Sequence, residues 1–137
     1  MTKRSIEVFF YGLFMDVELL RGQAVAPMNP RRAFVEDFAL HIGQRATLVP
    51  TMGARAYGML IALSHCEVAR LYAAPGLQHY LPEAVLAHTL EGQDVPALCY
   101  NLAEPPSASE RNPAYAAQLK AVLQALGFPD AYIASIQ

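Results

Sequence analysis

One stretch near the start of the chain has the residue types to bind an anion through its backbone alone. The apolar run over residues 6–11 breaks at Gly12, and a short helix is expected over residues 17–21. Gly12 allows a tight turn, and Asp16 is a good N-cap for that helix. The turn between them therefore exposes backbone N–H groups, and clustered donors of this kind hold a carboxylate or a phosphate. The alternative is a connector that only happens to contain a glycine.

The remaining residues with chemical potential do not form an evident site. Cys99 and His88 are a thiol and a base, but covalent catalysis needs the two within hydrogen-bond reach. In the expected hairpin they lie too far apart along the ladder. The four histidines lack the spacing of zinc ligands, so we expect no metal and no other cofactor.

Length and composition limit the class of protein. A chain of 137 residues with 54% hydrophobic and 16% charged residues has enough apolar side chains for one well-packed domain, over residues 1–137. The net charge of −2 and the scattered basic residues argue against a nucleic acid partner. No run of ~18 apolar residues and no signal-peptide cleavage site is present, so we expect a cytoplasmic protein without membrane contact. Cys66 and Cys99 are then expected to be buried, reduced thiols.

Hydrophobic patterning predicts a sheet followed by a helical C-terminus. After a loop over residues 23–32, strands are expected over residues 34–42, 45–49, 54–63, 80–89 and 95–101. Gly58, inside one of these strands, indicates a bulge or a close backbone approach. Ser64 and Glu67 form a capping box for a middle helix, and Asn112 is the N-cap of a late amphipathic helix that Gly127 ends. We therefore predict an α+β fold in which a small mixed or antiparallel β-barrel carries flanking helices.

The order of short motifs along nearly the whole chain resembles the γ-glutamylcyclotransferase-like family, which includes the AIG2-like proteins. The motifs are Tyr11-Gly12-Leu13-Phe14-Met15, Gly58-Met59-Leu60-Ile61-Ala62-Leu63-Ser64, Tyr80 with Val85, Pro96-Ala97-Leu98-Cys99-Tyr100, Asn112-Pro113-Ala114-Tyr115 and Gly127-Phe128-Pro129-Asp130-Ala131-Tyr132. Leu13 stands in the place of a serine of the family's first loop.

The resemblance implies a cavity at the first loop, where backbone amides hold a glutamyl carboxylate. It further implies that a glutamate acts as general acid and base while the substrate's own α-amine attacks the γ-carbonyl, which releases 5-oxoproline and a free amine. The ligand-binding residues implied here are Tyr11, Gly12, Leu13, Phe14, Met15, Tyr80 and Tyr115.

The family's glutamate belongs to a Leu-Asp-x-x-Glu-Gly pattern, and here residues 71–76 place Pro75 at its position. Proline has no ionisable group and no N–H, so it cannot transfer a proton. Loss of a general acid or base typically costs ~10²- to 10⁴-fold in rate. Glu83 is the nearest candidate replacement in sequence, whereas Glu36 and Asp37 stand at a strand edge where solvated charges are normal.

Three functions remain open from the sequence. The first is a γ-glutamylcyclotransferase-like protein whose cavity binds a small carboxylate or γ-glutamyl-type ligand with weak or no cyclotransferase activity, in effect a pseudoenzyme. The second is an active transferase with a relocated acid such as Glu83. The third is a non-enzymatic interaction protein whose cavity is filled by side chains such as Leu13 and Phe14. The sequence leaves the oligomeric state open.

Overall fold

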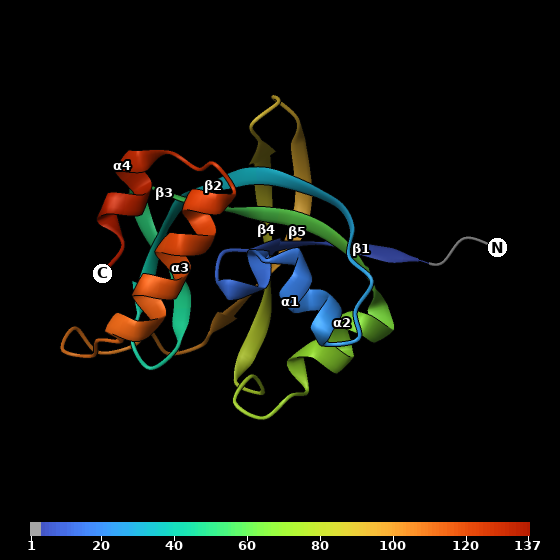
Figure 1. Cartoon of the computed structure of the whole chain (residues 1–137), viewed down its shortest axis with the longest axis horizontal. Helices are drawn as coiled ribbons and strands as arrows, with labels where there is room; N and C mark the ends of the chain where they lie inside the picture. Colours follow the sequence, from blue (N-terminus) through green and yellow to red (C-terminus); the bar gives the residue numbers. More distant parts are fainter. Residues whose placement is uncertain (1–3) are drawn as a thin grey trace.

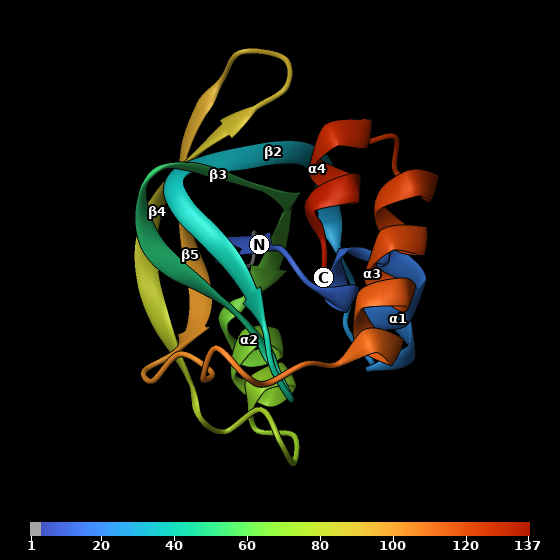
Figure 2. The ribbon, with the colours of Figure 1, turned by 90° about the vertical axis from the view of Figure 1, so that its left-hand side faces the viewer.

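A computed structural model describes residues 4–137 and contains a closed barrel of five strands (Figures 1 and 2). The strands are β1 (Ser5–Phe10), β2 (Met28–Ile42), β3 (Ala46–Ser64), β4 (Tyr80–Thr89) and β5 (Asp94–Leu102). Their order around the barrel is β1-β3-β2-β4-β5, and all neighbours are antiparallel except β1 and β5, which meet in parallel at Val8 and Leu98. The predicted mixed barrel is confirmed.

The helices lie outside the barrel. They are the 3₁₀ helix η1 (Leu13–Met15) and the α-helices α1 (Val17–Gly22), α2 (His65–Tyr72), α3 (Pro113–Ala125) and α4 (Asp130–Ser135). Figure 2 shows α1, α3 and α4 together on one side, whereas α2 lies at one end of the barrel. No helix in the described part of the chain is long and apolar enough to cross a membrane.

The predicted helix caps are all present. Asp16 accepts a hydrogen bond from the N–H of Glu18, and Asn112 accepts one from the N–H of Tyr115. Ser64 and Glu67 form the complete capping box at the start of α2. These caps were predictable because each joins residues two or three positions apart, so local sequence alone specifies them.

The strand boundaries differ from the prediction in two places. β2 begins at Met28 rather than at residue 34, because a bulge at Asn29, with φ of 50°, lets the strand continue past Pro30. The two strands expected over residues 45–49 and 54–63 are one long strand, β3, which continues through Pro50. Opposite Pro50, a second irregularity between Glu36 and Phe38 of β2 takes up the change in register.

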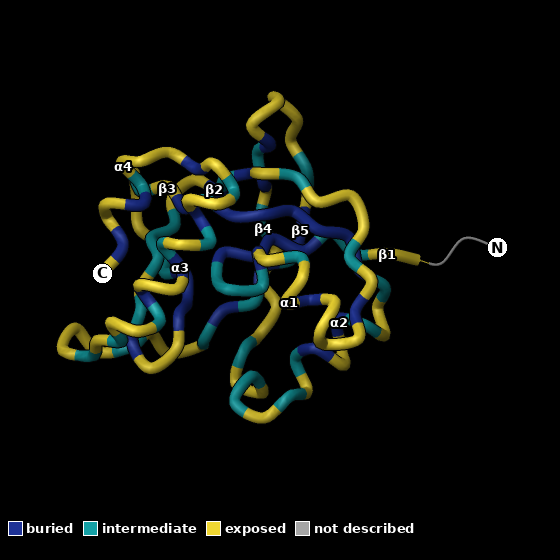
Figure 3. Tube along the Cα trace, viewed as in Figure 1, coloured by how far each residue is buried: buried dark blue, intermediate teal, exposed yellow. Residues whose placement is uncertain are grey.

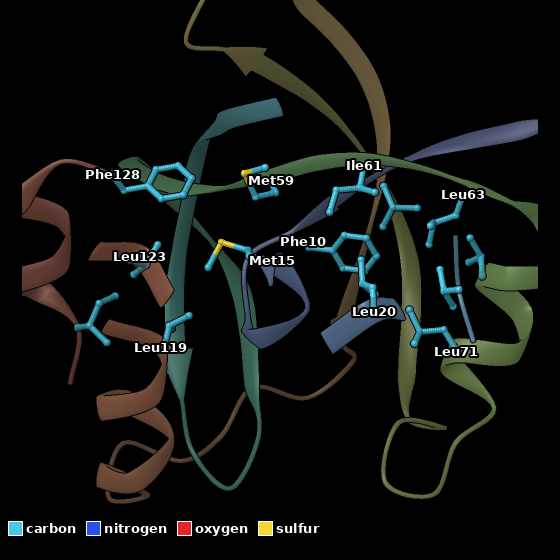
Figure 4. Close-up of a cluster of buried hydrophobic side chains, with 14 of the residues drawn as sticks. Phe10, Met15, Leu20, Met59, Ile61, Leu63, Leu71, Leu119, Leu123 and Phe128 are labelled. Carbon is cyan, nitrogen blue, oxygen red and sulfur yellow. The ribbon is translucent and has the colours of Figure 1, made fainter. Parts of the chain in front are cut away.

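Two apolar clusters form because β1 alternates its side chains between the faces of the sheet. Phe9 points into the barrel, where it packs with residues such as Leu60 and Cys99. Phe10 points outward into the cluster under the helices, which Figure 4 shows, and the buried segments of Figure 3 follow the same strands. Cys99 is buried as expected, but Cys66 is exposed, because it lies on the solvent side of α2.

Candidate functional site

The loop that follows β1 lines a cavity of about 260 Å³ at the end of the barrel near α2. Typical small-ligand sites measure ~300–1,000 Å³, so this cavity suits a small molecule. Segments that are distant in sequence surround it: the first loop, the turn before β3, the end of α2, the starts of β4 and α3, and the end of β5. The lining residues are Phe9, Phe10, Tyr11, Gly12, Leu13, Phe14, Leu19, Gln44, Arg45, Ala46, Tyr72, Leu77, Tyr80, Tyr100 and Tyr115.

Gly12 is required because another side chain occupies the space of its missing Cβ. A Cβ built on Gly12 would lie 2.5 Å from the hydroxyl oxygen of Tyr115. The backbone angles of Gly12, φ −108° and ψ −153°, are accessible to any residue. The glycine thus permits the close approach of α3 to the loop, rather than the tight turn that its identity predicted.

The first loop has backbone N–H groups that no backbone carbonyl of the described residues pairs. η1 begins at Leu13, and the first N–H groups of a helix have no partner within it. Within residues 4–137, no backbone carbonyl accepts a hydrogen bond from the N–H of Gly12, Leu13 or Phe14. The N–H of Leu13 faces the Tyr115 hydroxyl, and this contact partly opposes the rise in the Tyr115 pKa that burial causes.

Met15 is a correction to the predicted set of ligand-binding residues. Its side chain is fully buried in the cluster between the barrel and the helices, where Figure 4 shows it pointing toward α3. It does not line the cavity. The reason is the turn of η1, which places Leu13 and Phe14 on the cavity side and Met15 on the core side. The other six predicted residues, Tyr11, Gly12, Leu13, Phe14, Tyr80 and Tyr115, do line it.

Five tyrosines give the cavity an aromatic wall. The rings of Tyr72 and Tyr100 are stacked with centroids 4.0 Å apart and an interplanar angle of 14°, and the Tyr80 ring is tilted at 6.1 Å from Tyr72. The Tyr11 hydroxyl donates to the carbonyl of Tyr100 at 2.7 Å. Tyr80 donates to the carbonyl of Ala46, which ties the start of β4 to the start of β3.

These phenols are hydrogen-bond donors and not bases at neutral pH. Burial raises the pKa of Tyr80 to about 12, although the Arg45 charge opposes part of that rise. Burial also raises the pKa of Tyr11, Tyr72 and Tyr100 above the usual value. All of them therefore remain protonated and uncharged.

Arg45 is the one charged residue among those that line the cavity. Its guanidinium packs against the turn after α2, since a Cβ built on Gly76 would lie 3.0 Å from the Arg45 Nη2. Within the described chain Arg45 takes part in none of the ion pairs. A free guanidinium next to unpaired N–H groups and neutral phenols makes a site suited to an anion.

Among residues 4–137, no carboxylate lines the cavity. Pro75 is exposed in the turn after α2 and is not a lining residue. Glu83 is exposed on β4 and accepts a hydrogen bond of 2.8 Å from the Asn101 amide. It lines a separate hollow beside Leu48 and Pro105 that shares no residue with the cavity.

The other acids and nucleophiles considered from the sequence also lie elsewhere. Glu36 pairs with Arg55 at 3.2 Å, and Asp37 accepts from the N–H of Gly53 at 2.9 Å. Cys99 lies opposite Glu83 in the hairpin, whereas His88 lies opposite Asp94 and contacts its carboxylate at 2.7 Å. Among residues 4–137, no three His, Cys, Asp or Glu side chains cluster so as to hold a metal ion.

Sequence reasoning missed Arg45, Tyr72 and Leu77 as lining residues. Tyr72 was visible only as the residue in place of an expected aspartate, and Arg45 only as the start of a strand. No local sequence pattern identifies Arg45 or Tyr72 as a lining residue, because their positions at the cavity depend on how the turn before β3 packs against the turn after α2. The glycine at position 76 was the one feature of the sequence that could have indicated the approach of Arg45, because it leaves room for a neighbouring side chain.

Comparisons with known proteins first define the class of fold. No family model and no curated protein matches this sequence. The structure nevertheless has the fold of the γ-glutamylcyclotransferase-like and AIG2-like proteins, as the order of motifs implied.

Particular solved structures show how far the likeness extends. A gamma-glutamyl cyclotransferase is similar with a TM-score of 0.81 and 21% identity, over 98% of this chain and 89% of that one. An uncharacterized human protein follows with a TM-score of 0.77 and 22% identity, over 97% and 88% of the two chains. An AIG2-like protein of mouse has a TM-score of 0.59 and 16% identity, over 80% and 89%.

Proposed function

We propose that this protein binds a small carboxylate or γ-glutamyl-type compound in the cavity at the first loop, with weak or no cyclotransferase activity. The observation that carries the proposal is the set of residues that line the cavity and the space that they leave open. The cavity is open, with about 260 Å³ of space, and Arg45 is its one charged lining residue. Gly12, Leu13 and Phe14 also line it, and no backbone carbonyl of the described residues pairs their N–H groups.

The residues that line the cavity also argue against efficient cyclotransfer, because none of those described is acidic. Proton transfer in that reaction needs a group within hydrogen-bond reach of the substrate amine. The lining tyrosines hold their protons too tightly to act as bases, as the Tyr80 pKa of about 12 illustrates. An interaction protein with a filled cavity is the less favoured alternative, because Leu13 and Phe14 line the space without closing it.

A thermal-shift screen with 5-oxoproline, γ-glutamyl amines, glutathione and simple carboxylates tests the proposal. A ligand at 100 times its Kd stabilises the folded state by about 2.7 kcal/mol, which raises Tm by several degrees. Leu77→Trp should abolish the shift, because Leu77 lines the cavity and an indole there fills it. The matched control is Leu86→Trp, since Leu86 is exposed on β4 and lies outside the cavity.

The same samples are assayed for 5-oxoproline released from γ-glutamyl compounds. Binding without product supports the proposal. Rapid product formation would overturn the second half of it, and loss of that product in Glu83→Gln would identify Glu83 as a relocated acid. If no compound shifts Tm, or if Leu77→Trp shifts with the ligands as the wild type does, the cavity is not the binding site.

A further inference from the structure

We infer that the ligand of this cavity is an organic anion with an aromatic or otherwise apolar body and no ammonium group beside its carboxylate, with Arg45 as its counter-ion. The inference rests on the proposed function, in that it assumes a carboxylate ligand, and it narrows the class of that ligand. It follows from the charge, the lining and the shape of the cavity.

Arg45 is placed to meet a ligand rather than another residue. It lies on the turn between β2 and β3 and lines the cavity, and its guanidinium packs against the turn at Gly76. No carboxylate in the described residues neutralises it. A planar guanidinium with several N–H groups is the side chain best suited to grip a carboxylate through two hydrogen bonds.

The rest of the lining suits an apolar body. Besides the stacked pair of Tyr72 and Tyr100, the lining residues include Leu13, Phe14 and Leu77. Aromatic rings contribute most when they pack against another ring or a flat apolar group. With about 30 Å³ for each water of the liquid, the volume of about 260 Å³ corresponds to about nine waters, so the body is the size of one ring with a short side chain.

An ammonium group next to the carboxylate would be disfavoured. Tyrosine faces do attract cations, and a cavity walled only by tyrosines would accept an amine. Here the Arg45 charge stands at the same cavity, and none of the lining residues is acidic. A zwitterion would therefore lose the hydration of its ammonium without gaining an opposite charge.

The test compares four probes by isothermal titration calorimetry: 3-phenylpropionate, phenylalanine, 2-phenylethylamine and 5-oxoproline. The first three share one aromatic body and differ in charge, and the fourth is an anion without an aromatic ring. We expect 3-phenylpropionate to bind at least 10-fold more tightly than each of the others. Arg45→Gln should weaken its binding by about 10- to 100-fold, the usual range for a hydrogen bond to a charged group, and Arg45→Lys by less.

Arg111→Gln is the matched control, because it removes the same charge from an exposed position outside this cavity. Arg45 is itself exposed, so the variants should keep the wild-type Tm. If phenylalanine or 2-phenylethylamine binds as tightly as 3-phenylpropionate, the inference is wrong. It is also wrong if Arg45→Gln and Arg111→Gln have equal effects, or if 5-oxoproline binds most tightly; in these cases the proposed carboxylate site stands. If neither anion binds and no compound of the thermal-shift screen does, the proposed function itself fails.

Discussion

The contact between Gly12 and Tyr115 makes a sharp prediction about stability. A Cβ on Gly12 would lie 2.5 Å from the Tyr115 hydroxyl oxygen, whereas ordinary contacts begin near 3.4 Å. In Gly12→Ala the hydroxyl must therefore retreat by roughly 1 Å, and overpacking of this kind costs ~1–3 kcal/mol. The smaller conformational entropy of the unfolded alanine chain returns ~0.4–1 kcal/mol. We expect Gly12→Ala to lower the free energy of unfolding by about 1–2 kcal/mol.

Tyr115→Phe should reverse the sign of this effect. Once the hydroxyl is removed, the nearest atom to the new methyl group is the ring Cζ at 3.9 Å, an ordinary contact. In that background Gly12→Ala should be neutral or stabilising by up to ~1 kcal/mol. The coupling energy between the two positions is then about 1–3 kcal/mol, as is usual for residues in contact.

Urea denaturation of the four proteins of this cycle measures the coupling, as shifts of the midpoint at constant m. Gly22→Ala is the control, because nothing lies within 4 Å of a Cβ built on this residue at the end of α1. It should be neutral or stabilising in both backgrounds. If Gly12→Ala lowers the free energy of unfolding equally in the wild-type and Tyr115→Phe backgrounds, the close approach of α3 to the loop is not the reason that position 12 requires glycine.

Three further changes test the framework around the site. Gly58→Ala should destabilise by about 3 kcal/mol or more, because its Cβ would collide with the backbone carbonyl of Phe10, which cannot move without breaking the β1–β3 pairing; an unchanged urea midpoint would contradict this. Ser64→Ala should cost about 1 kcal/mol through loss of the capping box, whereas a wild-type midpoint would mean that the cap contributes nothing. Tyr132→Phe should stabilise by about 1 kcal/mol at pH 7, because the Tyr132 hydroxyl is buried without a hydrogen-bond partner. Burial also raises the Tyr132 pKa to about 12, so the protein loses stability through this group as the pH rises from ~10, the pKa in the unfolded chain, to 12, whereas below pH ~10 the group makes no pH-dependent contribution. The fall in stability between those pH values should be smaller in Tyr132→Phe by up to about 3 kcal/mol, and identical pH profiles for the two proteins would refute the assignment.

The parts of the site that could be predicted from the sequence are those built by neighbouring residues. Gly12 and Asp16 frame a turn only a few residues long, so their types were enough to locate the backbone donors. Met15 was assigned wrongly because membership of the loop does not say which way a side chain points. The rotation of η1 decided that, and the packing of Met15 under the helices fixes the rotation.

The same division applies to the strands. Gly58 indicated either a bulge or a close backbone approach, since an interior glycine is costly unless something needs its space, and the structure has the close approach to Phe10. Pro30 was predicted to lie in the loop over residues 23–32, and Pro50 to follow the end of the strand over residues 45–49, yet both lie within strands. Each lies next to an irregularity in the pairing of β2 with β3, and the cost of a missing N–H depends on the partner strand, which local sequence does not contain.

The sequence by itself determined the helix caps, the order of motifs and most of the elements, because these depend on side-chain periodicity and on hydrogen bonds that span a few residues. It also predicted that Pro75 stands at the position of the family's glutamate. Only the tertiary structure decided which residues line the cavity. Closure of the barrel sets Arg45 beside Gly76 and lays the Tyr115 hydroxyl over Gly12, while it leaves Glu83 in a different hollow. The charge of the site thus depends on residues 30 to 100 positions apart in the chain, whose meeting is fixed by strand pairing and core packing rather than by local preference.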